Sequence, residues 1–161
     1  MKNFQIRREV HQGVYSLDSV AQGLEESTAL VRLFNGEEVL RAFLSHTEVE
    51  VAPFRGYMWV NTDGGRIVVS RDYLREAEEV LLYLDLIHEI VHLRQLSQGM
   101  ELFDEKYSYD QRPTELEAYR VTLEEARSLG LSDDFIREYL KVDWMTDGQH
   151  RRLLRALELP P

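Results

Sequence analysis

The sequence predicts one α+β domain in which a small, mostly antiparallel sheet packs against helices. The two clearest strand-like stretches lie within residues 47–70, and helix-like periodicity covers most of the chain on both sides of them. A chain of 161 residues is long enough for one domain with its own core. No internal repeat, low-complexity tract or proline-glycine linker divides it, so we treat residues 1–161 as a single domain.

The N-terminal part predicts one short strand and two helices. Residues 4–10 alternate weakly between apolar and polar side chains, as a short strand does. Ser16 is a suitable N-cap for a long helix, which the pair Asn35-Gly36 would end. A second, shorter helix is expected over residues 37–44.

The middle of the chain predicts a β-hairpin. Residues 47–60 are rich in valine and aromatic side chains, although Pro53 and Gly56 interrupt them. Residues 66–70 form a second strand-like run after the turn sequence at 63–65.

The C-terminal part predicts a succession of helices. The first covers residues 72–98, is apolar almost all round at its centre, and stops at Gly99. Further helices are expected over residues 114–129, 132–141 and 147–157.

Composition and charge exclude several classes of protein. The side chains are 43% hydrophobic and 30% charged, which is typical of a folded domain. A net charge of −10 disfavours nucleic-acid and anionic-membrane partners. The absence of cysteine excludes disulfides and thiolate zinc sites. With no signal peptide and no membrane span expected from the sequence, we predict a cytoplasmic protein.

The most informative motif is His88-Glu89-Ile90-Val91-His92, inside the predicted buried helix. Side chains four residues apart on a helix share a face, so the two imidazoles can bind one zinc ion (Zn2+). Glu89 can then accept a proton from a water molecule on that ion and pass it to a leaving amine. A buried polar triplet must also be paired or coordinated, which a metal achieves. The alternative is a solvent-facing polar stripe on an amphipathic helix.

A third ligand is needed, because catalytic zinc usually has three protein ligands. The metzincin pattern is excluded, since Gln95 and Gln98 stand where glycine and histidine would be required. Glu115 and Glu117 on the following helix are candidates, and they point about 200° apart. Glu117 also has a structural alternative, because Thr114-x-x-Glu117 matches a helix capping box.

The run His-Glu-Ile-Val-His-Leu-Arg-Gln at 88–95, followed by Glu-Leu-Glu-Ala-Tyr at 115–119, resembles the gluzincin metallopeptidases, especially their small single-domain forms. The resemblance implies a zincin-like fold with its metal-binding core at about residues 72–130. It implies zinc, peptide hydrolysis, and Glu117 as the third ligand, with Glu115 in reserve. It also implies an edge strand that holds an extended peptide, for which residues 66–70 are the first candidate and an interior position is the alternative.

The chain departs from the gluzincin pattern after the third ligand. Many members carry an acidic or amide residue two or four positions later, where this sequence has Tyr119 and Val121. Asp85 or Glu115 could orient a histidine instead.

Other polar and aromatic residues have weaker functional signals. The candidates for a hydrogen-bond donor to the substrate carbonyl are Tyr107, Tyr109, Tyr119 and His150, but we expect each of them to be structural or exposed. Trp59 and Trp144 are expected in the core.

The sequence thus predicts a zinc metallopeptidase in which His88, His92 and Glu117 bind the metal and Glu89 is the general base and acid. Its expected partner is an extended peptide. The alternative is a zincin-fold protein that has a structural metal and acts as a regulatory or partner-binding module. A purely structural site would not need Glu89, so its presence favours the enzyme.

Overall fold

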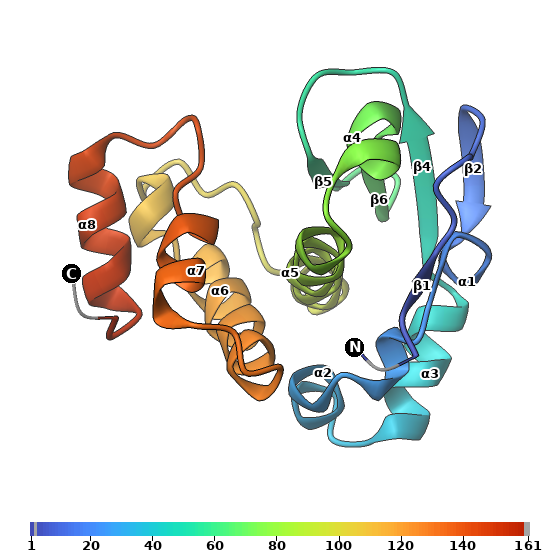
Figure 1. Cartoon of the computed structure of the whole chain (residues 1–161), viewed down its shortest axis with the longest axis horizontal. Coiled ribbons are helices and arrows are strands. Elements are labelled where there is room, and N and C mark those ends of the chain that lie inside the picture. Colours follow the sequence, from blue (N-terminus) through green and yellow to red (C-terminus); the bar gives the residue numbers. More distant parts are fainter. Residues whose placement is uncertain (2, 160–161) are drawn as a thin grey trace.

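In the computed structural model, which describes Met1 and residues 3–159, helix α5 (Glu79–Ser97) lies in the middle of the molecule. A sheet and helices from the first half of the chain lie on one side of it, and the C-terminal helices lie on the other (Figure 1). The architecture is α+β, as predicted. The centre of α5 is buried on all its faces because its apolar residues surround the helix axis.

The larger sheet has four strands in the order β2-β4-β6-β5. Their bounds are β2 Gly13–Ser16, β4 Glu48–Ala52, β5 Met58–Asn61 and β6 Arg66–Ser70. Strands β5 and β6 form the predicted hairpin, while β4 pairs with β6 in parallel and with β2 in antiparallel orientation.

The expectation that residues 66–70 form an edge strand is wrong. Strand β6 is interior, and four of its five residues are buried because both neighbouring strands and the core cover them. The edge strands of this sheet are β2 and β5, and β5 pairs with β6 on one side only.

The predicted long helix after Ser16 is also wrong. Ser16 does precede a helix, but that helix ends within four residues, and the chain then pairs with the N-terminal strand. Gly23 has φ +88°, and a Cβ there would lie 2.6 Å from the carbonyl oxygen of Asn3. This close approach interrupts the helix and requires glycine. The elements of this region are β1 Gln5–Ile6, α1 Leu17–Val20, β3 Ala21–Gln22, η1 Leu24–Glu26, α2 Thr28–Leu33 and α3 Glu37–Ser45.

The predicted helix over residues 72–98 is two helices, α4 (Arg71–Glu76) and α5. They are separated because Ala77 and Glu78 are extended. Gly99, at φ +78°, follows the end of α5 as predicted.

The three predicted C-terminal helices are confirmed as α6 (Pro113–Ser128), α7 (Asp133–Tyr139) and α8 (Asp147–Ala156). A short 3-10 helix, η2 (Tyr109–Gln111), precedes α6. It is joined to α8 by the buried carboxylate of Asp110, which accepts hydrogen bonds from Arg152 at 2.7 and 3.2 Å.

The buried carboxylate of Glu125 on α6 joins three helices. It accepts hydrogen bonds from the hydroxyls of Ser27 and Thr28 and from the backbone N–H of Ala29 at the start of α2. It also accepts one from the Tyr83 hydroxyl on α5, at 2.8 Å. These bonds fix α6 beside α5, where the site described below lies.

Among the described residues, no helix combines the length and the apolar character needed to cross a membrane.

Candidate metal centre

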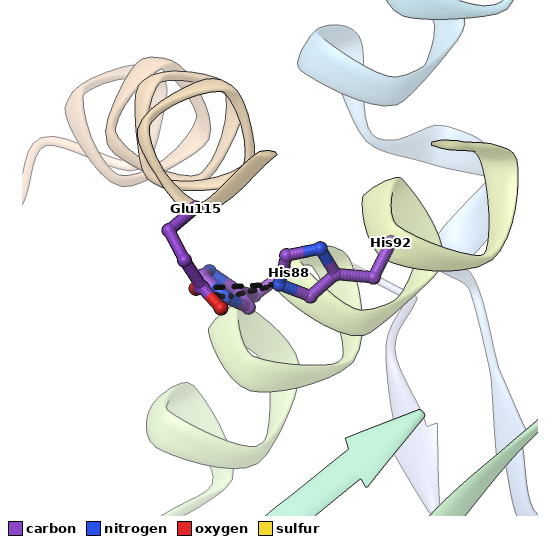
Figure 2. Close-up of side chains that lie close together, drawn as sticks. All are labelled: His88, His92 and Glu115. Carbon is purple, nitrogen blue, oxygen red and sulfur yellow. Dashed lines mark hydrogen bonds and ion pairs between the residues drawn. The ribbon is translucent and has the colours of Figure 1, made fainter. Parts of the chain in front are cut away.

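Helices α5 and α6 bring three ligating side chains to one point, as Figure 2 shows. The Nε2 atoms of His88 and His92 are 3.0 Å apart. The Oε2 atom of Glu115 lies 3.2 Å from Nε2 of His88 and 3.4 Å from Nε2 of His92. All three side chains are buried.

These spacings suit a shared metal ion. Ligand atoms about 2.0–2.1 Å from one tetrahedral ion lie about 3.3 Å from one another, and the three distances fall close to that value. Two imidazole nitrogens that both present lone pairs repel each other at 3.0 Å unless a proton or a cation lies near them. The donor set of two nitrogens and one carboxylate oxygen can hold a metal ion.

The local sequence explains the convergence. His88 and His92 are one helical turn apart, and Glu115 lies in the first turn of α6. The small, buried Ala118 lies on the same stretch of α6, where it needs little space between the helices. The Tyr119 ring packs on the His88 imidazole, with centroids 4.5 Å apart.

Gln95 determines which nitrogen of His92 faces the centre. Its Nε2 donates to the carbonyl oxygen of Thr114 at 2.9 Å and to Oε2 of Glu117 at 2.8 Å. Its Oε1 must therefore accept the third bond, from Nδ1–H of His92 at 2.8 Å. A hydrogen on Nδ1 leaves Nε2 of the neutral ring with a lone pair for a metal.

The structure places Glu117 outside the ligand group, contrary to the sequence-based assignment. Its carboxylate is half-exposed and accepts from Gln95, while Oε1 lies 4.0 Å from Arg94. It does not form a capping box either. Helix α6 begins at Pro113, and the Thr114 hydroxyl donates to the carbonyl oxygen of Leu102. Glu115, the reserve candidate, lies with the two histidines in the group that could hold a metal ion.

Charge in the centre is shared between Glu115 and His92. Burial opposes ionisation of Glu115, but hydrogen bonds from His88 and His92 hold the pKa of its carboxyl far below the usual value. Burial also opposes the charged form of His92, yet the hydrogen bond to Glu115 and the nearby carboxylate of Glu89 raise the pKa of His92 to about 9. Burial lowers the pKa of His88.

Other contacts complete the surroundings of the centre. Arg112 lies 3.7 Å from Oε1 of Glu115, the oxygen that does not face the histidines. Nδ1 of His88 is buried and has no hydrogen-bond partner within the described part of the chain. Asp85 does not orient a histidine. It accepts hydrogen bonds from the hydroxyls of Tyr73 at 2.5 Å and Tyr139 at 2.8 Å.

Glu89 lies on the wall of a cavity of about 520 Å³ that is also lined by the three candidate ligands. Burial raises the pKa of Glu89 to about 8. Its carboxylate has no hydrogen-bond partner among residues 1 and 3–159, so it is available to a molecule in the cavity.

The cavity lies between the sheet side and the helical side of the molecule. Met58, Trp59 and Val60 of the edge strand β5 line it. At its rim the Tyr57 hydroxyl donates to Oδ2 of Asp143 at 3.0 Å, which links the loop before β5 to the loop between α7 and α8.

The two tryptophans line this cavity, so the expectation that they lie in the core is wrong. Trp59 is 45% exposed and Trp144 is 56% exposed. Tyr109 and Tyr119 also line the cavity, and their hydroxyls are 2.7 Å apart. Tyr107 is exposed, and His150 bonds to the carbonyl oxygen of Arg137.

Comparison with protein-family models, with curated proteins and with solved structures found no match. The functional interpretation therefore rests on the residues and their geometry.

Sequence reasoning missed Gln95 as a partner of His92, although the signal was present. Gln95 lies three residues after His92 on the same helix, a spacing at which side chains touch. The tyrosine pair around Asp85 had no such signal, because Tyr73 and Tyr139 come from distant parts of the chain.

Proposed function

We propose that this protein is a zinc-dependent peptidase of a zincin-like kind. The observation that carries the proposal is the convergence of His88, His92 and Glu115 beside an unpaired Glu89 on a cavity wall. Two histidines and a glutamate are a ligand set typical of hydrolytic zinc sites, with a coordination position left for water or substrate.

Zinc bound by these residues would supply a Lewis acid that polarises a peptide carbonyl and makes a water molecule more acidic. Glu89 is adjacent to His88 in sequence and faces the same cavity. The positive charge of a bound zinc ion would lower the pKa that burial raises, so the Glu89 carboxylate could then take a proton from water there. The same oxygen can return the proton to the amine that leaves when the peptide bond breaks.

Strand β5 is the element suited to hold the substrate. Within the described part of the chain its outer edge has no neighbouring strand, so its backbone can pair with an extended peptide. Because β5 lines the cavity, a peptide added to it would pass beside the metal ligands.

The lack of cysteine agrees with a cytoplasmic protein.

The test is the substitution Glu89→Gln in protein prepared without an affinity tag. The parent should bind close to one zinc per chain and cleave peptides from a diverse library. Glu89→Gln should retain zinc and fold, but lose hydrolysis by about 10²–10⁴-fold, because the amide cannot accept the proton.

His92→Ala is the control and should lose most of the zinc. Full hydrolysis by Glu89→Gln would assign the base to another residue. A parent that binds zinc but cleaves no peptide would favour the partner-binding alternative.

A further inference from the structure

The cavity extends beyond the metal centre to a partly buried acidic group, Asp85. This residue lies on α5 one turn before Glu89 and lines the same cavity. Each of its oxygens accepts one hydrogen bond, from Tyr73 and from Tyr139. A carboxylate can accept more than two hydrogen bonds, so Asp85 keeps acceptor capacity.

Asp85 has no positively charged partner. Among the described residues, no lysine or arginine makes an ion pair with it, and the two tyrosine hydroxyls are its hydrogen-bond partners. Buried carboxylates in proteins are usually paired with a cation. Burial raises the pKa of Asp85 to about 6, although the hydrogen bonds from Tyr73 and Tyr139 act to lower it.

Aromatic rings form a continuous series from Asp85 to the metal centre. Tyr73 contacts Tyr57, with centroids 5.1 Å apart, and Tyr57 contacts Trp144 at 5.9 Å. Trp144 contacts Tyr109 at 5.9 Å. The series continues through Tyr119 to the imidazole of His88, at centroid distances of 6.3 and 4.5 Å. The faces of such rings attract cations.

The charged side chains around the cavity also favour a positively charged occupant. Lys141 is the one lysine among the lining residues, and no arginine lines the cavity in the described part of the chain. The lining carboxylates are Glu78, Asp85, Glu89, Glu115 and Glu138. Glu115 faces the histidines, which leaves four acidic groups for an occupant.

We propose that this part of the cavity binds a basic side chain, lysine or arginine, of a peptide that lies along β5. Asp85 would supply the opposite charge, and the rings of Tyr57, Tyr73 and Trp144 would contact the alkyl chain and the cation. The assignment rests on the proposed function for the identity of the ligand as a peptide. Recognition of a cationic group by the cavity does not depend on hydrolysis.

Binding is tested first on the zinc-loaded parent protein with small probes, followed by tryptophan fluorescence, since Trp144 lines the cavity. Phenethylammonium should bind about 10-fold or more tightly than phenethyl alcohol, a neutral probe of similar shape, and than 3-phenylpropionate, an anion. Equal binding of the ammonium and the alcohol would overturn the assignment, and so would binding of none of the three. This comparison needs no variant.

Asp85→Asn should remove the preference for the ammonium over the alcohol while leaving zinc content unchanged. The matched control is Asp63→Asn, in the exposed turn between β5 and β6, which should behave as the parent. A preference that survives in folded Asp85→Asn would assign recognition to another carboxylate and refute this role for Asp85.

Hydrolysis is tested with peptides that differ at one position only, carrying lysine, norleucine or glutamate. The parent should cleave the lysine peptide at least about 10-fold faster than the norleucine peptide, and Asp85→Asn should abolish that difference. Cleavage without any preference for lysine would overturn the inference and leave the proposed function standing. Binding of the ammonium with no cleavage of any peptide would refute the proposed function and support the cation site.

Discussion

The substitutions Glu115→Gln and Glu117→Gln distinguish the two glutamates on α6 at constant side-chain shape. Glu115→Gln removes the charge that faces both histidines, at 3.2 and 3.4 Å. Because this oxygen is one of three ligand atoms, zinc affinity should fall by about 100-fold or more.

Glu117→Gln should change zinc affinity by less than about 10-fold, because Glu117 is linked to His92 only through Gln95. Its carboxylate accepts from Gln95, and a glutamine there can still accept that hydrogen bond through its amide oxygen. Gln95 also keeps its bond to the carbonyl oxygen of Thr114.

The assay is competition with a chelating dye at fixed pH, with circular dichroism to confirm that each variant is folded. If Glu117→Gln lost more affinity than Glu115→Gln, the ligand set derived from the geometry would be wrong. Equal, small losses in both variants would place the zinc site elsewhere.

Two further substitutions test contacts around the site. Gln95→Leu keeps the side-chain volume but removes the acceptor for Nδ1–H of His92, so zinc affinity should fall about 10- to 100-fold in titrations of folded protein. Parental affinity would contradict the role of Gln95. Arg152→Met should lower the free energy of unfolding at pH 7 by about 1.5–3 kcal/mol, because the buried carboxylate of Asp110 loses its charged partner. Burial opposes ionisation of Asp110, but the bonds from Arg152 and Ser108 lower its pKa below the unfolded value of about 3.9. The contribution of the pair is therefore present above that value and lost as the pH falls through the lower, folded pKa. The difference in unfolding free energy between parent and variant should begin to shrink below about pH 4, and a difference that stays constant from pH 7 to pH 3 would refute the linkage.

The local part of the site could be predicted from the sequence, whereas the part that depends on helix packing could not. His88 and His92 share a face because of the helical repeat alone. The choice between Glu115 and Glu117 depends on the rotation of α6 about its axis. That rotation is set by packing, including the bonds that Glu125 makes to α2 and α5.

The difference between local sequence signals and tertiary packing also explains which predictions of the fold were correct and which were wrong. The helices after residue 112 were predicted closely, because caps and glycines mark their ends locally. The helix predicted after Ser16 fails because of a tertiary contact, the approach of Gly23 to Asn3. Trp59 and Trp144 were expected in the core from their apolar character, but they line a cavity that forms only when distant elements meet.

The hydrogen bond between Tyr57 and Asp143 has a consequence for how a chain could reach the metal centre. It joins the two walls of the cavity at an exposed rim, where such a bond contributes about 0.5–1.5 kcal/mol. Thermal fluctuations break an interaction of that size frequently. The Tyr57 ring also packs against Trp144 of the same loop as Asp143, with centroids 5.9 Å apart, so two contacts hold the walls together at this point. A substrate of the proposed peptidase would therefore have to pass this bridge or break both of its contacts to reach the metal centre.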